Sequence, residues 1–284
     1  MELTPGDPGT LILGERATKQ AIAEKNKELG YDQPFLVRYA KYVLQAAQGN
    51  LGNSWSTNRP VISEILNRMP TTFTLALGAS IIGLLIGLPL GIISAVKQYS
   101  PVDYLGTSLA MFLASFPPFW IGMMLIIIFA LKLGWLPSFG ANSLKSFILP
   151  WITTACVFIA SMLRMTRTSM LESIRMDYVR TARAKGQVER KVIVDHALHN
   201  ALLPVVTLMG IEFGSLMGGT VTVETVFSLP GIGSLIIDGI RLKDVPMVIG
   251  STITLATIFM LMMILVDILY AFIDPRIRAR YVKR

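Results

Sequence analysis

The sequence has few of the side chains that most metal and redox sites need. It contains one cysteine, Cys156, and two histidines, His196 and His199, in 284 residues. A single cysteine excludes an internal disulfide framework and any Cys-x-x-Cys metal or redox site. Two imidazoles three residues apart make only a weak metal site, so we interpret both histidines as structural or interfacial.

Charged residues are also scarce. Asp, Glu, Lys and Arg make up 15% of the chain, whereas a soluble domain carries about 25%. Hydrophobic residues make up 52%, and the mean hydropathy is +0.57. The apolar residues form blocks of about 20 residues or more, which is long enough to cross a hydrocarbon core about 30 Å thick. The composition therefore predicts a polytopic membrane protein, all-α because helices pair every backbone polar group within lipid.

Five apolar blocks are long enough to be membrane-spanning helices. They cover approximately residues 73–96, 104–131, 147–165, 202–227 and 245–273. The dipeptide Pro117-Pro118 predicts a kink in the second span. Small residues recur at every fourth position in two spans, which predicts close packing on neighbouring helices, although glycine is common in membrane helices generally. These residues are Ala79, Gly83, Gly87 and Gly91 in the first span, and Gly210, Gly214 and Gly218 in the fourth.

The distribution of Lys and Arg predicts the orientation of the spans. Eight lie between residues 164 and 200 and five follow Ile273, whereas the loops near 132–146 and 228–244 hold two each. Because cytoplasmic loops carry the excess of positive charge, the two rich regions are placed in the cytoplasm. The net charge of +8 is then explained by these loops, and nucleic acid is not expected as a partner.

Alternation of the spans divides the chain into three regions. Residues 1–71 form an extracytoplasmic polar region, residues 72–275 the transmembrane domain with a cytoplasmic loop at 166–201, and residues 276–284 a cytoplasmic basic tail. Within the first region, the pattern predicts helix from Arg16 to Ala47 with breaks at Gly30 and Pro34. No signal peptide is evident, so an exported N-terminal region is most simply explained by a further span ahead of Met1.

No motif of a common catalytic class occurs in the sequence. There is no GxxxxGK[ST] phosphate loop, no HExxH zinc pair and no GxSxG nucleophile elbow. The chain is therefore not expected to hydrolyse ATP or to bind a cofactor itself.

Three acidic residues lie within the apolar spans: Glu212, Glu224 and Asp267. Ionisable groups at membrane depth are costly and usually face the bundle interior or water. Glu212 lies nearest the middle of its span and is the best candidate for a translocation pathway. Glu224, a second pathway candidate, and Asp267 lie near span ends, where an interfacial position is expected.

The cytoplasmic loop has a distinctive pattern. Good helix formers from Tyr178 to Lys185 are followed by Gly186, a helix stop. Apolar residues then recur at helical spacing among charges, which predicts an amphipathic helix ending at Leu203-Pro204. A helix, a glycine turn and a second helix would project rigidly into the cytoplasm and suit docking to another protein. The alternative is a basic loop that only fixes topology or contacts anionic lipid.

This loop resembles that of ATP-binding-cassette (ABC) importer permeases, and more narrowly of the oligopeptide/dipeptide/nickel permease family. The resemblance rests on residues 178–186 and 196–204, and on further motifs from residue 3 to residue 280. These are Pro5-Gly-Asp-Pro8, Gly218–Phe227, Leu229–Gly233, Asp244-Val-Pro246 with Gly250, and Asp274-Pro-Arg276. The wider permease signature begins Glu-Ala-Ala where this chain has Arg180-Thr-Ala182, a version usual in the peptide branch.

The resemblance implies a type I, MetI-like permease fold, with five visible spans of an expected six, in the cytoplasmic membrane of a prokaryote. Its partners would be a second, homologous permease, two ABC ATPase subunits that bind ATP and Mg, and an extracytoplasmic solute-binding protein. Short peptides are the implied substrate, with nickel or another small solute as the alternative. The ATPase-coupling residues would be Asp177, Tyr178, Arg180, Thr181, Ala182, Arg183, Ala184, Lys185 and Gly186.

Within this loop, the resemblance gives different residues different roles. Arg180, Arg183 and Lys185 would contact acidic or carbonyl groups on the ATPase. Ala182 and Ala184 would permit close approach, and Gly186 would make the turn.

Two other classes of protein remain as alternatives. An ion-coupled secondary transporter could use Glu212 and Asp267, but the chain shows no convincing internal repeat and too few acids for a relay. An intramembrane enzyme would need paired catalytic residues, and none is apparent.

Overall fold

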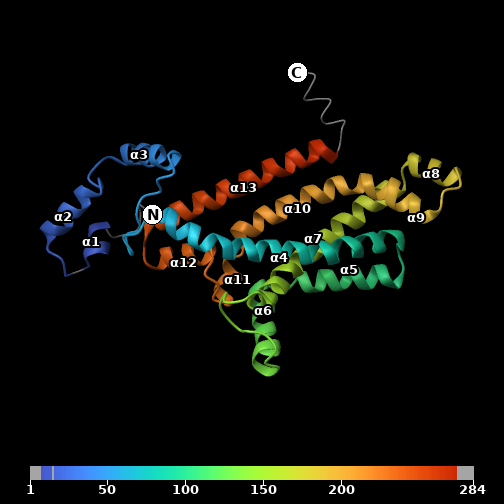
Figure 1. The fold of residues 1–284 in the computed structure, drawn as a ribbon, viewed down its shortest axis with the longest axis horizontal. Helices are drawn as coiled ribbons and strands as arrows, with labels where there is room; N and C mark the ends of the chain where they lie inside the picture. The colour runs from blue at the N-terminus through green and yellow to red at the C-terminus, as the bar shows by residue number, and fades with distance from the viewer. Residues whose placement is uncertain (1–7, 15, 274–284) are drawn as a thin grey trace, which may run out of the picture. The chain divides into compact units, whose positions relative to one another are not determined.

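The computed structural model describes residues 8–14 and 16–273, and within these residues the backbone forms helices and no strand (Figure 1). A single antiparallel bridge pairs Asn53 with Pro60. The chain divides into two compact units. The first comprises the chain up to Thr72 with Pro230–Ala256, and the second comprises Phe73–Leu229 with the chain from Thr257 onward.

Within residues 8–14 and 16–273, four helical segments are long and apolar enough to span a membrane. They are α4 (Val61–Val96), η2 with α7 (Leu144–Ile174), α9 to α10 (Glu189–Gly218), and Val245–Val266 of α13 (Val245–Ile273). A bent pair raises the number to five if it is counted as one span. The prediction of a polytopic helical bundle is confirmed. Helix α4 begins earlier than predicted, because Glu64 and Arg68 lower the hydropathy of its first turns without interrupting the helix.

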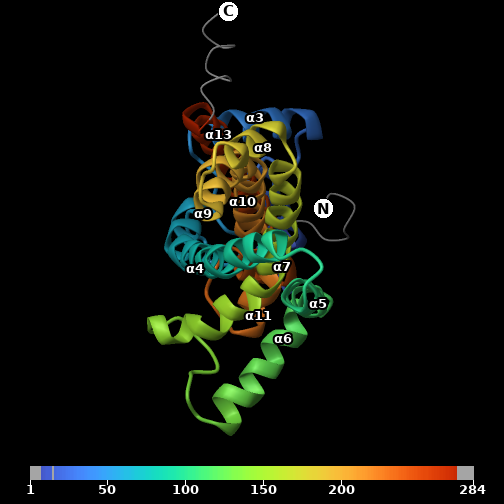
Figure 2. The same ribbon diagram turned by 90° about the vertical axis from the view of Figure 1, so that its right-hand side faces the viewer.

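The bent pair consists of α5 (Pro101–Ala114) and α6 (Pro118–Leu125), which continues as a π-helix, η1 (Ile126–Lys132). The two segments meet at 96°, and both views show α6 turning away from α5 (Figure 2). The predicted kink at Pro117-Pro118 is thus a complete break. Pro118 forces Pro117 into an extended conformation, with φ −58° and ψ 138°, and then starts α6 at the position where proline suits a helix.

Small residues bring α4 against α7 (Ile148–Ile174) in the second unit. A Cβ atom added to Gly83 would lie 2.1 Å from the ring of Phe158, and one added to Gly87 would lie 2.6 Å from Cβ of Met162. One added to Gly91 would lie 2.6 Å from Cβ of Thr166. The predicted close packing of the first span is confirmed.

The fourth span, α10 (His199–Gly219), uses its glycines in the same way against α13. A Cβ atom on Gly210 would lie 2.0 Å from Val266, and one on Gly214 would lie 2.7 Å from the ring of Phe259. Gly218 differs, because nothing lies within 4 Å of the Cβ position there. The small-residue pattern therefore predicts two of these three contacts.

A buried ion pair joins α5 to α7. Arg167 donates from Nε to Asp103 Oδ1 over 2.7 Å and from Nη2 to Oδ2 over 2.8 Å. The Asp103 side chain is 2% exposed, and the backbone N–H of Tyr99 donates to the same carboxylate. This two-pronged geometry fixes the start of α5 against the C-terminal half of α7.

Loops that the topology assigns to one side of the membrane lie at one end of the second unit. Near the end of α4, Ala95 packs with residues of the 166–201 loop, and Arg175 lies within 3.5 Å of Gln98. At the opposite end, the N–H of Gly140 donates to the carbonyl of Phe227. These loops therefore lie at the ends of the second unit that the predicted alternation of the spans assigns to them.

The first unit contains α1 (Pro8–Leu13), α2 (Lys19–Glu28), α3 (Phe35–Ala47), α12 (Ile232–Arg241) and the first turns of α4 and α13. The predicted helices with breaks at Gly30 and Pro34 are confirmed. A core of Val61, Ile65 and Ile232, all fully buried, joins the N-terminal region to residues 230–256. The N-terminal region is thus one part of a composite unit.

Asp244 holds the turn before α4 in place. Its carboxylate, 1% exposed, accepts hydrogen bonds from the hydroxyls of Ser54 and Ser56 and from the backbone N–H of Ser56. Burial by itself raises the pKa of Asp244, but these hydrogen bonds and one from the backbone of Trp55 outweigh it and hold the pKa below its ordinary value.

The lowered pKa makes the stability of this unit depend on pH. The stabilisation from the Asp244 carboxylate is fully present above its unfolded-state pKa of about 3.9 and is lost as the pH falls through the lower folded-state pKa. Asp244→Asn should melt at a lower temperature than the wild type from pH 8 down to pH 5, consistent with about 1–3 kcal/mol for hydrogen bonds to a charged group. The difference should narrow below about pH 4. A constant difference down to pH 3 would contradict the assignment.

Candidate functional site

The predicted cytoplasmic loop folds as a helical hairpin, which we define as residues 177–198. Helix α8 (Asp177–Ala184) is followed by Gly186 in the left-handed region, with φ +76°. The N–H of Gly186 donates to the carbonyl of Arg183, and that of Gln187 donates to the carbonyl of Ala182. This pair of bonds is a Schellman motif, which favours glycine at this position. The predicted helix stop at Gly186 is confirmed.

A small apolar core holds the hairpin together and attaches it to the spans. Val179 and Ala182 on α8 face Val192 and Ala197 on the returning segment, and Met170 of α7 joins them. Of these, Val179, Val192, Ala197 and Met170 are fully buried. Because protein cores are close-packed, α8 is expected to move together with α7.

Ser173 connects three segments by hydrogen bonds. Its hydroxyl donates to the carbonyl of Ala197 over 2.7 Å. Since that uses its only proton, Tyr178 donates to Ser173, also over 2.7 Å. Tyr178 therefore fixes α8 to α7 and to the returning segment.

The prediction that the returning segment ends at Leu203-Pro204 is wrong, because the helix continues through these residues. It starts as α9 (Glu189–Lys191), continues as a π-helix, η3 (Val192–Leu198), and enters α10 with Pro204 inside the helix. Helices within membranes tolerate proline where local π adjustment supplies other partners for the backbone. The hairpin is consequently continuous with the fourth span.

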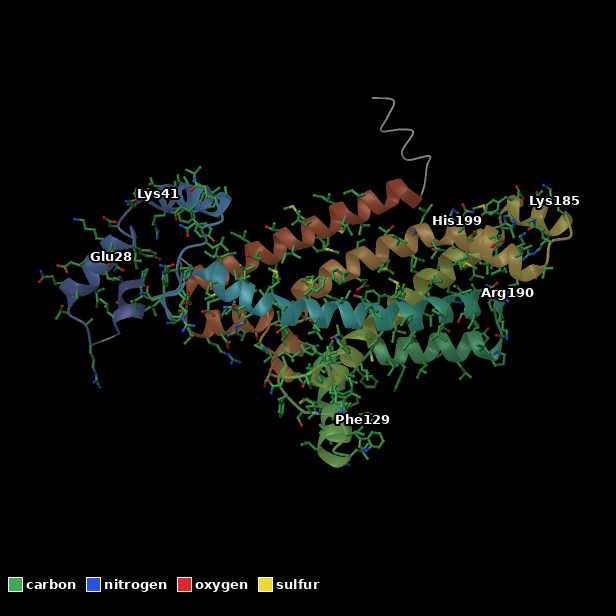
Figure 3. The ribbon with its side chains drawn as sticks, viewed as in Figure 1. Glu28, Lys41, Phe129, Lys185, Arg190 and His199 are labelled. Atoms are coloured by element: carbon green, nitrogen blue, oxygen red, sulfur yellow. The ribbon has the colours of Figure 1, made fainter. Side chains whose placement is uncertain are left out.

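The predicted coupling residues divide between the surface and the core of the hairpin. Ala182 is 6% exposed and packs inward, so its small side chain brings α8 close to its own hairpin. The others are exposed: Asp177, Tyr178, Arg180, Thr181, Arg183, Ala184, Lys185 and Gly186. Figure 3 shows Lys185 and Arg190 at the tip of this hairpin. The exposed face is thus mainly cationic.

An ion pair closes the turn at Gly186. Arg183 donates to both carboxylate oxygens of Glu189, over 2.7 and 3.1 Å. This hydrogen bonding raises the pKa of Arg183. The side chains of Arg183 and Glu189 are 39% and 58% exposed, so solvent weakens the attraction.

We expect the core to contribute more to the stability of the hairpin than this ion pair. Glu189→Gln should lower the free energy of unfolding by less than about 1 kcal/mol. Val179→Ala should lower it by about 2 kcal/mol, because it leaves a cavity. Thermal melts of the purified protein, or hydrogen exchange of the amides in α8, would measure both. A larger effect from Glu189→Gln would show that the ion pair is the main support.

The two pathway candidates differ in their surroundings. Glu212 lies half-buried on α10. Glu224 lies on a separate short helix, α11 (Val221–Val226), is fully buried, and accepts a hydrogen bond from Thr220 over 3.1 Å. The interfacial position of Glu224 stays a prediction, but its carboxylate is enclosed by protein and does not face outward. The side chain of Asp267 lies outside the described residues.

Histidine and acidic side chains do not gather into a metal site. Among the described residues, no three His, Cys, Asp or Glu side chains could hold an ion. His196 lies 2.7 Å from Oε1 of Gln187, and this contact stabilises the start of the returning segment. His199 is exposed.

Three residues that support the hairpin could not be selected from the sequence. Ser173 and Glu189 contact side chains of α8, and Gln187 contacts His196 on the returning segment, yet each resembles an ordinary polar residue. The only local signal is the placement of Arg183 and Glu189 on either side of a helix-stopping glycine.

Family comparison places these features among known transport proteins. The family model described as "binding-protein-dependent transport system inner membrane component" matches residues 87–279. A second model, described as the N-terminal part of such a membrane component, matches residues 1–76. Together they cover most of the chain.

Similar full-length proteins are known in several bacteria. A dipeptide transport system permease protein of Alkalihalophilus pseudofirmus is 41% identical over 98% of this chain and 92% of its own length. A glutathione transport system permease protein of Salmonella typhimurium is 42% identical over 98% of this chain and 91% of its own.

Solved structures support the fold. The inward-facing MetNI methionine ABC transporter aligns with a TM-score of 0.63 at 16% identity, over 74% of this chain and 96% of that chain. An amino acid ABC transporter aligns with a TM-score of 0.56, also at 16% identity, over 75% and 94%. The predicted MetI-like fold is therefore confirmed.

Proposed function

Since this chain belongs to the family of inner membrane components of binding-protein-dependent transport systems, we propose that it imports short peptides with energy from ATP. It is a permease of the inner membrane. Relatives at 41–42% identity, named for dipeptides and for glutathione, support a peptide substrate. The observation that carries the ATP-driven mechanism is the rigid cationic hairpin between α7 and α10.

The hairpin is the proposed contact with a separate ATPase. We expect two ABC ATPase subunits to hold ATP and Mg, so that this chain binds no cofactor. A second, homologous permease and an extracytoplasmic solute-binding protein would complete the transporter. Exposed cations of the hairpin, namely Arg180, Arg183 and Lys185, would meet acidic or carbonyl groups of the ATPase.

The contacts of the hairpin provide a mechanical route to the spans. When the ATPases close, α8 would be displaced, and its core and the Tyr178–Ser173 hydrogen bond would move α7 with it. The returning segment would move α10 directly, because η3 and α10 form one continuous helix. The spans would thereby alternate between outward and inward openings, with Glu212 as the acidic group proposed to border the path.

Uptake by the complete transporter in proteoliposomes tests this function. With the binding protein outside and ATP enclosed, accumulation of radiolabelled Ala-Phe should require ATP hydrolysis. A protonophore should leave the rate unchanged. Uptake that continues without ATP and stops on adding the protonophore would overturn the proposal and favour an ion-coupled transporter.

A further inference from the structure

A cavity of about 630 Å³ lies within the first unit. It is lined by the end of α2, one face of α3, Trp55 and the first turn of α13. Its volume falls in the range of small-molecule sites, which is about 300–1,000 Å³. The predicted topology places it on the extracytoplasmic side.

The wall of the cavity on α3 is built at helical spacing. Phe35, Arg38, Tyr39 and Tyr42 recur at intervals of three and four residues and all line the cavity. Phe35 and Tyr39 stack with centroids 6.2 Å apart, although they are 54% and 58% exposed. Stacked aromatic rings left open to solvent in a concave surface are typical of a ligand site.

Cationic side chains outnumber acidic ones in the lining of the cavity. Three cations line it, Lys27, Arg38 and Lys41, against one carboxylate, Glu28. Figure 3 shows Glu28 on α2 and Lys41 on α3. Lys41 donates to Oε1 of Gln33, which leaves the remaining protons of its ammonium group for a ligand. The guanidinium of Arg38 lies 4.1 Å from the centroid of the Tyr31 ring.

A buried hydroxyl completes the set of polar groups. The Oη atom of Tyr42 is shielded from solvent and has no hydrogen-bond partner among the described residues. Burial raises the pKa of Tyr42 above its ordinary value, so the group remains a proton donor. A buried donor without a partner is costly, and a small rotation of the Tyr42 ring toward the cavity would let a bound acceptor remove that cost.

The floor of the cavity is held by the network around Asp244. Trp55 lies between the two serines that bind the Asp244 carboxylate, and Val245 and Pro246 follow directly after Asp244. The apolar side of the cavity is therefore fixed before any ligand arrives, which limits the entropy lost on binding.

We propose that this cavity binds a short zwitterionic peptide outside the translocation pathway, with its carboxylate at Lys41 and Tyr42 and its apolar side chain on the rings of Phe35, Tyr39 and Trp55. The peptide ammonium group would lie toward Glu28. The inference rests on the proposed function for its choice of ligand class. It adds a site at which the permease itself binds peptide on the extracytoplasmic side, independently of the solute-binding protein.

Equilibrium binding to the complete transporter tests the site. The complex would be placed in nanodiscs of phosphatidylcholine, without binding protein or nucleotide, and titrated with radiolabelled Ala-Phe. Tyr42→Phe and Lys41→Gln should each weaken binding about tenfold, equivalent to about 1.4 kcal/mol. The matched control Lys19→Gln removes an exposed cation of α2 that does not line the cavity and should leave binding unchanged. Ala-Phe amide, which lacks the carboxylate, should bind as weakly to the wild type as Ala-Phe binds to the variants.

Several results would overturn the inference. These are the absence of saturable binding, equal binding of the amide, equal affinity in the two cavity variants and the wild type, or displacement of the peptide by phosphatidylglycerol, which would identify a lipid site. Tyr42→Phe keeps the size of the ring, so misfolding is not expected to obscure the result. ATP-driven uptake by the same preparation separates the two proposals: normal uptake without binding at the cavity contradicts this inference alone, whereas absent uptake contradicts the proposed function.

Discussion

Replacing Gly87 by alanine is expected to destabilise the protein by about 3 kcal/mol, because the added methyl group has no space. Its Cβ would lie 2.6 Å from Cβ of Met162 and 2.9 Å from the carbonyl oxygen of Ile159. The second neighbour is backbone, so no change of rotamer can relieve the overlap. Helix α4 would have to move away from α7, and the packing at Gly83 and Gly91 would be lost with it.

A matched variant isolates this effect from the general preference of helices for alanine. Gly218→Ala adds the same methyl group to another helical glycine, where no atom lies within 4 Å of the Cβ position. That variant should melt at or slightly above the wild-type temperature, since alanine favours helix by about 1 kcal/mol over glycine. Gly87→Ala should melt about 10 °C lower, as measured by size-exclusion chromatography of heated samples. Equal melting temperatures for both variants would contradict the close packing of α4 against α7 at Gly87.

Replacing Gly186 by valine should abolish most transport while leaving insertion into the membrane intact. The residue has φ +76°, a conformation that costs an L-residue about 1–2 kcal/mol and a β-branched one more. No atom lies within 4 Å of the Cβ position, so the penalty is one of backbone conformation and not of crowding. We expect the turn to rearrange, α8 to lose its orientation, and peptide uptake to fall at least tenfold.

Asparagine provides the control at this position. It occupies the left-handed region more readily than other non-glycine residues and can end a helix in the same way. Gly186→Asn should therefore keep most of the uptake that Gly186→Val loses. Uptake and ATP hydrolysis would be measured on the same proteoliposomes, because an uncoupled transporter hydrolyses ATP without moving peptide. Wild-type uptake in Gly186→Val would contradict the coupling role of the hairpin.

Much of the fold could be predicted from local patterns. Hydropathy predicts the helical spans, and the spacing of small residues predicts the contacts of Gly83, Gly87 and Gly91. The end of α8 is predicted by Gly186, which adopts the positive φ that ends a helix. Each of these features depends on a period or on a single backbone conformation, which neighbouring residues specify. The break at Pro117-Pro118 is likewise specified by neighbouring residues, but the angle between α5 and α6 could not be predicted from them.

The contacts that connect distant segments could not be predicted. Asp103 and Arg167 lie near the ends of different spans, where charged residues are usually interpreted as topology signals, and their pairing appears only in the folded chain. Ser54 and Asp244 are 190 residues apart. The burial of Glu224 depends on the break after α10, which the apolar run through residue 227 conceals.

The pairing of Asp103 with Arg167 has a consequence for how the permease would respond to force. Arg167 and Ser173 both lie on α7, so this helix is clamped to α5 at one site and to α8 at the other. A displacement of α8 would therefore move α7 and α5 together with it. Bending would concentrate at residues 115–117, where the helix is already interrupted and the rings of Phe112, Phe116 and Trp120 pack one against the next across the gap. We therefore expect this joint to act as the hinge between the driven end of the bundle and α6.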